Sequence, residues 1–143
     1  MDSNSDSHQV YLGLGSNLGD RRQNIEQAIV LIGERVGTVV RQSSLIETEP
    51  WGFASDNRFL NGVVCCMTQL SPRQVLRATQ QIERILGRRH KTPPNARHYS
   101  DRPIDIDILL YDQLTVQEPD LQIPHPLMQQ RDFVMIPLRE IME

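Results

Sequence analysis

The alternation of apolar and polar residues along the chain predicts four strands. Residues 10–14 form a short apolar run, residues 38–48 are rich in Val, Thr and Ile, and residues 59–68 alternate with a period of two. A further strand is expected over 105–111, after a loop that contains prolines. Runs of this length, bounded by Gly, Pro, Asn and Asp, are typical of strands in a packed sheet.

Two segments between these strands carry the apolar spacing of amphipathic helices. The first begins at Asp20, a favourable N-cap, and ends near Gly37. The second begins at Ser71, which is followed by Pro at the first helical position and Gln at the third. Its apolar stripe is expected to consist of Val75, Ala78, Ile82, Ile85 and Leu86, before Gly87 ends the helix.

The order β-α-β-β-α-β predicts an α+β fold of the ferredoxin-like class, an antiparallel sheet with helices packed on it. An extra C-terminal hairpin is expected from a turn at 112–113 and a short strand over 114–116. Short helices are expected near 126–130 and near the end of the chain. We expect a disordered tail over 1–8 and one domain over 9–143.

Composition narrows the class of protein. The chain has 143 residues with 38% hydrophobic and 23% charged residues, which is typical of one folded domain. Its net charge of −3 and its 5% aromatic content argue against nucleic acid as a partner. No apolar run is long enough for a membrane helix, so we expect a cytoplasmic monomer without a membrane partner. The adjacent Cys65 and Cys66 are interpreted as reduced core residues.

Basic residues gather in one part of this acidic chain. Eight of its 15 Lys and Arg residues fall between Arg73 and Arg102. The loop from Arg88 to Arg102 holds five of them beside a single acid, Asp101. Because guanidinium groups bind phosphate oxygens in pairs, the loop indicates a small anionic ligand. The alternative is a solvated run of charge.

The most specific local motif is Asp105-Ile106-Asp107. On a strand both carboxylates point to one face, with Cα atoms about 6.5–7 Å apart. Two such charges repel by about 3 kcal/mol at an effective dielectric near 20, so they call for a cation. A Mg²⁺ ion bound together with phosphate could offset this repulsion, and a salt bridge to the basic loop is the alternative. Nucleotide-sugar glycosyltransferases also use this motif.

Other segments offer weaker signals. Gly13 to Gly19 is rich in glycine but fits neither a dinucleotide-binding loop nor a P-loop. It is interpreted as a strand-to-helix turn whose backbone and Asn17 amide face a ligand. Phe59 and Asn61 share one face of a strand, which suits a flat heterocycle, although a phenylalanine is more often part of the core. Gln80 and Glu83 lie outside the apolar stripe and are expected to face solvent. His125 is interpreted either as a hydrogen-bond donor to phosphate or as a residue of a turn.

These motifs together resemble those of the 6-hydroxymethyl-7,8-dihydropterin pyrophosphokinases of folate biosynthesis. The resemblance runs from about residue 10 to 141. It rests on LGLGSNLGD, TEPWG, FLNGVV, QQIERILGR, DRPIDIDILLY and IPHPLMQQRDFVMIPL. The pairing of R-x-x-D-[IL]-D with P-H-x(5)-R-x-F is specific to that family.

The resemblance implies a reaction and a set of site residues. The enzyme would transfer pyrophosphate from ATP to the hydroxymethyl group of the pterin and release AMP. The implied catalytic residues are Arg88, Arg102, Asp105 and Asp107, and the two aspartates would hold two Mg²⁺ ions. Pterin would lie between Phe59 and Phe133, in contact with Thr48, Trp51 and Asn61. ATP would be bound by Gln80, Glu83, Arg88, Arg102, His125 and Arg131, with the basic loop closing over it.

The chain departs from the family pattern at a few positions. Ser100-Asp101 stands where Gly-Pro is common, Tyr99 where some members have tryptophan, and His90 where others have a second arginine. Phe59 stands where others have tyrosine. A pterin- or nucleotide-binding module without catalysis is the competing hypothesis, and the intact acid pair with Arg102 argues against it.

Overall fold

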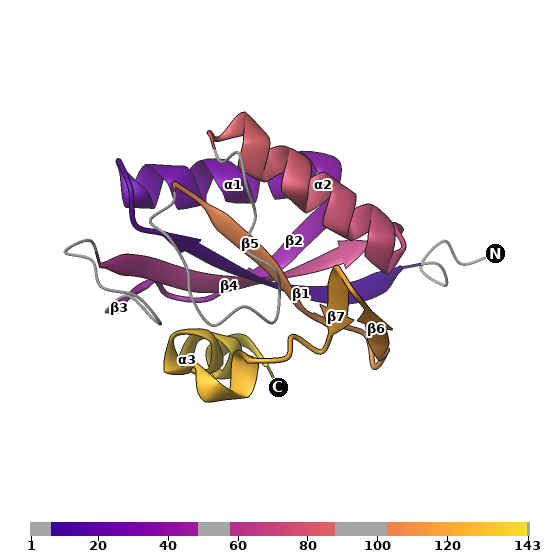
Figure 1. The fold of residues 1–143 in the computed structure, drawn as a ribbon. Coiled ribbons are helices and arrows are strands. Elements are labelled where there is room, and N and C mark those ends of the chain that lie inside the picture. The colour runs from indigo at the N-terminus through magenta and orange to yellow at the C-terminus, as the bar shows by residue number, and fades with distance from the viewer. Residues whose placement is uncertain (1–6, 49–57, 88–102, 143) are drawn as a thin grey trace.

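The chain folds into a five-stranded antiparallel sheet with helices on both faces, as a computed structural model describes for residues 7–48, 58–87 and 103–142 (Figure 1). Strands and helices follow in the order β1 (His8–Ser16), α1 (Arg21–Arg35), β2 (Gly37–Gln42), β3 (Ile46–Thr48), β4 (Phe59–Thr68), α2 (Pro72–Ile85), β5 (Asp105–Tyr111), β6 (Val116–Glu118), β7 (Leu121–Ile123), the 3₁₀ turn Met128–Gln130 and α3 (Asp132–Ile141).

The strand order confirms the predicted fold class. The sheet runs β2-β4-β1-β5, with the short β3 also pairing with β4, and the ladders are antiparallel. Strand β1 therefore lies between β4 and β5, which is the split-βαβ arrangement of the ferredoxin-like class. Helices α1 and α2 cover one face of the sheet, and α3 lies against the other (Figure 1).

The two-residue period of the strands divides the core into two clusters. On β1, Val10, Leu12 and Leu14 pack into the larger cluster beneath α1 and α2, whereas Tyr11 belongs to the cluster beneath α3. The same division holds along β4 and over residues 106–109 of β5. A register shift opposite Tyr11 and Leu12 then places Leu110 on the α3 side and Tyr111 in the larger cluster. The cluster on the α3 side consists of Tyr11, Val63, Cys65, Leu109, Met128, Val134, Leu138 and Ile141.

The strand predicted over 38–48 is two strands, β2 and β3. Its sequence has strand propensity throughout, but Ser43 breaks the ladder between them. The Ser43 hydroxyl oxygen accepts the backbone N–H of Val63 at 2.8 Å, and the backbone N–H of Ser43 donates to the Val63 carbonyl at 2.9 Å. A side-chain oxygen thus replaces the carbonyl that a continuous strand would offer.

Three other predictions need correction. The C-terminal hairpin forms between β6 and β7, so the segment 114–116 does not pair with residues 105–111. Ile85 was assigned to the apolar stripe of α2 but is 52% exposed at the end of that helix. The predicted tail over 1–8 lies mostly outside the described residues, and His8 already belongs to β1.

Both cysteines are buried free thiols, as expected. Cys65 and Cys66 point to opposite faces of the sheet, each in a different core cluster. Burial, with a smaller effect from the neighbouring Cys65, raises the pKa of the Cys66 thiol to about 11. This thiol therefore stays protonated at neutral pH and is a poor nucleophile.

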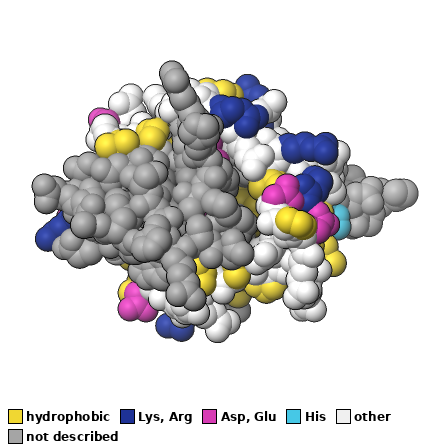
Figure 2. Space-filling view, in the orientation of Figure 1, with side chains coloured by type: hydrophobic (Ala, Val, Ile, Leu, Met, Phe, Trp, Pro, Cys, Tyr) yellow, Lys and Arg dark blue, Asp and Glu magenta, His cyan; other side chains and the backbone are white. Residues whose placement is uncertain are grey.

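The helices and the surface charge bear on where the protein could bind. None of the described helices is both long and apolar enough to cross a membrane. In the part of the chain that is coloured in Figure 2, acidic and basic side chains lie interspersed. One such group joins α2 to the β6–β7 hairpin, where Arg73 pairs with Glu118 and, at 2.9 Å, with Asp120.

Ser71→Ala should lower the free energy of unfolding by about 1 kcal/mol. The Ser71 side chain accepts the N–H of Gln74, and the Gln74 side chain accepts the N–H of Ser71, so the substitution removes half of a complete capping box. Urea denaturation followed by circular dichroism measures the change. Ser71→Asp retains a capping oxygen and should remain within about 0.5 kcal/mol of the parent. Equal losses for both variants would contradict this role.

Candidate active site

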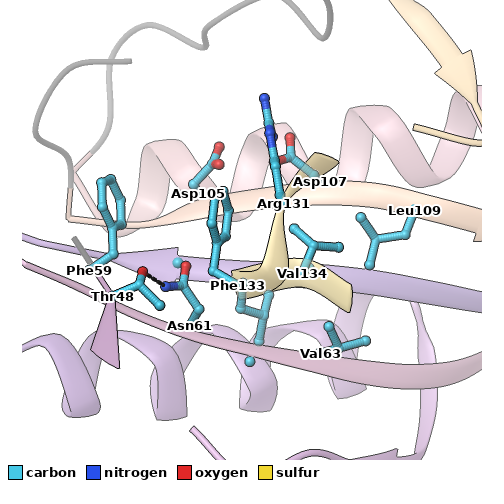
Figure 3. Close-up of a pocket in the computed structure, with 14 residues that line it drawn as sticks. Thr48, Phe59, Asn61, Val63, Asp105, Asp107, Leu109, Arg131, Phe133 and Val134 are labelled. Atoms are coloured by element: carbon cyan, nitrogen blue, oxygen red, sulfur yellow. Dashed lines mark hydrogen bonds between the residues drawn. The ribbon is translucent and has the colours of Figure 1, made fainter. Parts of the chain in front are cut away.

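A cavity opens on the α3 side of the sheet, between the start of α3 and strands β1, β4 and β5 (Figure 3). The space between its walls is about 570 Å³, and this figure includes the part that is open to solvent. Its lining comes from β1, β3, β4, β5 and the start of α3, and consists of Gly13, Leu14, Gly15, Thr48, Phe59, Asn61, Gly62, Val63, Asp105, Asp107, Leu109, Arg131, Phe133 and Val134.

Strand register arranges the floor of this cavity in rows. Gly15 lies opposite Asn61 of β4 on one side and Asp105 of β5 on the other. Gly13 occupies the same position between Val63 and Asp107. Because directly opposed residues share a face, each row runs from the β4 side chain, across a glycine, to an acid of β5.

The β4 side of the cavity combines two aromatic rings with an amide. Figure 3 shows Phe59 and Phe133 projecting into the cavity on either side of the Thr48–Asn61 pair. The Asn61 side chain is only 4% exposed, and its Nδ2 donates to Thr48 Oγ1 at 2.7 Å. This bond fixes which way the amide points, so Oδ1 is the amide's acceptor on the other side. Two rings with an amide between them suit a flat heterocycle with polar edges.

The β5 side carries the acid pair. Asp105 and Asp107 are both half-buried, and both line the cavity from one face of β5. Within the described residues no group of three or more His, Cys, Asp or Glu side chains is placed to hold a metal ion. Two carboxylates fit Mg²⁺ well, because this ion is commonly held by one or two carboxylates, with water and substrate phosphate as its other ligands.

Glu83 supports the acid pair from the opposite side of the strand. This α2 residue is 2% exposed, and its Oε2 accepts the backbone N–H of Ile106 at 2.7 Å. Among the described strands β5 lies at the edge of the sheet, and the Glu83 carboxylate bonds to one of its backbone N–H groups. The expectation that Glu83 faces solvent is therefore wrong, whereas Gln80, one turn earlier, is half-buried.

Two basic side chains are buried near the cavity. Arg131 is 2% exposed and lies 5.6 Å from the centre of the Phe133 ring, a cation–π distance. His125 is 6% exposed, and its Nδ1 accepts the N–H of Leu127 at 3.3 Å. In the neutral ring that bond leaves the proton on Nε2, which is then a hydrogen-bond donor.

Thr48 reaches the cavity from a strand of only three residues, which is anchored at both ends. Before the strand, the Glu140 carboxylate of α3 accepts the Ser44 N–H at 3.0 Å and the Ser44 hydroxyl at 2.9 Å. At its other end, Arg21 pairs with Glu47 at 2.7 Å and donates to the Arg58 carbonyl at 2.9 Å. These contacts hold Thr48 opposite Phe59, its partner in the β3–β4 ladder.

The structure thus brings seven of the predicted site residues into one cavity: Thr48, Phe59, Asn61, Asp105, Asp107, Arg131 and Phe133. Three others, Gln80, Glu83 and His125, do not line it. Trp51, Arg88 and Arg102 lie outside the described residues. Gly13 and Gly15 were expected in a turn that faces a ligand; they line the cavity from within β1, where they continue the same alternation as Tyr11.

Solved structures share this fold. A crystal structure titled HPPK-DHPS in complex with substrates has a TM-score of 0.74 and 15% identity, covering 94% of this chain and 40% of that chain. The Plasmodium falciparum HPPK-DHPS solved with pterin and p-hydroxybenzoate has a TM-score of 0.71 and 17% identity, covering 94% and 38%. The chain spans about two fifths of these proteins, and at such identity the similarity shows the fold alone.

Sequence comparison shows the family. The 2-amino-4-hydroxy-6-hydroxymethyldihydropteridine pyrophosphokinase of Porphyromonas gingivalis is 51% identical over 133 residues, covering 92% of this chain and 89% of the relative. The Bacillus subtilis enzyme of the same name is 40% identical over 133 residues, covering 92% and 77%. The family model described as 7,8-dihydro-6-hydroxymethylpterin-pyrophosphokinase (HPPK) matches residues 11–143. The chain therefore belongs to the 7,8-dihydro-6-hydroxymethylpterin-pyrophosphokinase family.

Proposed function

We infer that the chain catalyses the reaction of its family, the transfer of pyrophosphate from ATP to the hydroxymethyl group of 6-hydroxymethyl-7,8-dihydropterin. The observation that carries this inference is the composition of one cavity. An aromatic pair with a fixed amide lies on its β4 side, and two acids lie on its β5 side. A flat ring and a metal-bound polyphosphate therefore have adjacent places on one sheet face.

The β4 side would bind and orient the pterin. Phe59 and Phe133 would stack on its two faces, and Thr48 and Asn61 would bind its polar edge. Trp51 is kept as a pterin contact on the resemblance alone. The buried position of Asn61 supports this assignment, because a buried amide oxygen favours a ligand that donates a hydrogen bond to it.

The β5 side would bind the polyphosphate. Asp105 and Asp107 would hold Mg²⁺, for which two ions are proposed, and the metal would supply charge neutralisation on the phosphates. Arg131 and the Nε2–H of His125 would donate to phosphate oxygens. Gln80, Glu83, Arg88 and Arg102 are kept as ATP contacts on the resemblance alone. Arg88 and Arg102 would also stabilise the charge of the transferring group.

In the proposed reaction the pterin hydroxymethyl oxygen attacks the β-phosphorus of ATP in line. The new oxygen–phosphorus bond forms while the bond from that phosphorus to the α,β-bridging oxygen breaks, and AMP leaves with the bridging oxygen and its electron pair. The hydroxyl proton passes to solvent. We assign no general base among the described residues, so positioning and charge neutralisation would carry the rate. We also propose that the enzyme acts as a cytoplasmic monomer.

The test of this function is release of AMP from MgATP with and without 6-hydroxymethyl-7,8-dihydropterin. We expect AMP and the pterin diphosphate in equal amounts, and AMP only when the pterin is present. Binding of both ligands without AMP release would instead identify a binding module without catalysis. Absence of binding of either ligand would reject the site altogether.

Asp107→Ala should reduce AMP release by roughly 10²-fold or more, because metal binding contributes several kcal/mol to stabilisation of such transition states. Affinity for MgATP should fall, while affinity for the pterin should stay close to that of the parent. Isothermal titration calorimetry and an AMP assay measure the three quantities. Glu34→Gln, which removes an exposed acid on α1, is the control. Unchanged MgATP affinity with near-normal turnover would exclude the metal assignment.

Phe59→Ala and Phe133→Ala should each raise the dissociation constant of the pterin by roughly tenfold or more. Stacking on an aromatic side chain is worth about 1–3 kcal/mol per base-like ring. Ile136→Ala on the same helix as Phe133 removes a side chain that is 53% exposed and should bind the pterin normally. If both phenylalanine variants match the parent in equilibrium binding, the pterin binds elsewhere.

A further inference from the structure

A glycine stands at the centre of the row that joins the two halves of the site. Gly15 of β1 is opposite Asn61 on one side and Asp105 on the other. Adjacent strands are about 4.8 Å apart, so Asn61 and Asp105 are separated by roughly 10 Å of sheet. At Gly15 this stretch of floor is backbone without a side chain, and it lines the cavity.

The backbone of Gly15 does not require glycine. Among the described glycines, only Gly19 and Gly87 have a positive φ, and both lie outside the strands. Alanine is therefore compatible with the conformation at position 15, where a strand interior usually favours a residue with a Cβ. The reason for glycine here is the space above the strand.

That space borders both groups proposed to bind the heterocycle. A Cβ on residue 15 would lie 3.0 Å from Asn61 Oδ1, and 3.5 Å and 3.9 Å from Cδ1 and Cε1 of the Phe59 ring. The Asn61 amide has little freedom to move away, since its Nδ2 is bonded to Thr48 and the residue is buried. A single methyl group would therefore press on the acceptor oxygen and would fill the space beside the stacking ring at ordinary contact distance.

Gly13, in the next row, offers a direct comparison. The three atoms nearest to a Cβ there belong to the end of the Leu109 side chain, with Cδ2 at 3.3 Å. A leucine terminus can rotate by a few tenths of an ångström, whereas the Asn61 amide is held by its hydrogen bond. A side chain at position 15 would thus disturb a fixed hydrogen-bond acceptor, whereas one at position 13 would displace only the movable end of a leucine.

We propose that Gly15 is a specificity-determining residue of this enzyme. Its missing side chain opens a slot across β1, in which the heterocycle binds Asn61 Oδ1 with a hydrogen-bond donor on its edge. From there the reactive arm of the substrate crosses the strand towards Asp105. The proposal rests on the proposed function, because it takes the pterin as the ligand of the β4 side.

Gly15→Ala should weaken binding of 6-hydroxymethyl-7,8-dihydropterin at least tenfold in isothermal titration calorimetry. Affinity for MgATP should stay within about twofold, and the melting temperature should stay close to that of the parent, because the gain from a Cβ in a strand offsets the tight contact with Asn61. Gly13→Ala should weaken pterin binding less than Gly15→Ala does. Gly33→Ala on α1, where a Cβ would meet no atom within 4 Å, is the control for the exchange itself.

A double-mutant cycle with Asn61→Ala separates this role from a general distortion of the sheet. Removing the amide relieves the contact, so Gly15→Ala should cost less than threefold when Asn61 is already alanine. Full additivity of the two substitutions, or parent-like binding by Gly15→Ala, would overturn the proposal. A parent chain that binds no pterin would instead overturn the proposed function.

Discussion

The two-residue period of three neighbouring strands is the constraint on which the rest of the structure depends. Even-numbered residues of β1 and their neighbours on β4 and β5 enter the core beneath α1 and α2, and the odd-numbered ones face α3. The register then aligns Asn61, Gly15 and Asp105 in one row. A slip of one residue in any of these strands would bury a polar group and expose a core residue, so stability and site geometry are fixed by the same pairing.

The acid pair shows how the two sides of the sheet depend on each other. Asp105 and Asp107 belong to β5, which is an edge strand of the sheet that the structure describes. Glu83 accepts the backbone N–H of Ile106, the residue between them, from a helix on the opposite face. A buried carboxylate is costly without hydrogen bonds. The hydrogen bond between Glu83 and Ile106 therefore satisfies both the buried carboxylate of α2 and a backbone N–H of the strand that carries the acids.

Local patterns were sufficient to predict the elements but not all of their partners. The capping box at Ser71 and the alternation over 59–68 and 105–111 predicted α2, β4 and β5 closely. The break at Ser43 depends on a hydrogen bond to Val63, 20 residues away, which strand propensity does not reveal. Glu83 and Ile85 were misassigned for a related reason. Helical spacing predicts which residues of α2 share a face. It does not predict that β5 lies close enough to bury Glu83, or that Ile85 at the end of the helix stays exposed.

Sequence motifs identified most of the site residues. Whether these residues form a cavity depends on how α3 packs on the sheet. The apolar side of α3 packs on Tyr11, Val63 and Cys65 of the odd-numbered face. Val63 also begins the Gly13 row, so the cavity borders this packing, and the first turn of α3 brings Phe133 to the same border (Figure 3). A helix packs poorly over residues without side chains, because such contacts bury little apolar surface. The glycines of β1 therefore help both to end the C-terminal core and to begin the active site.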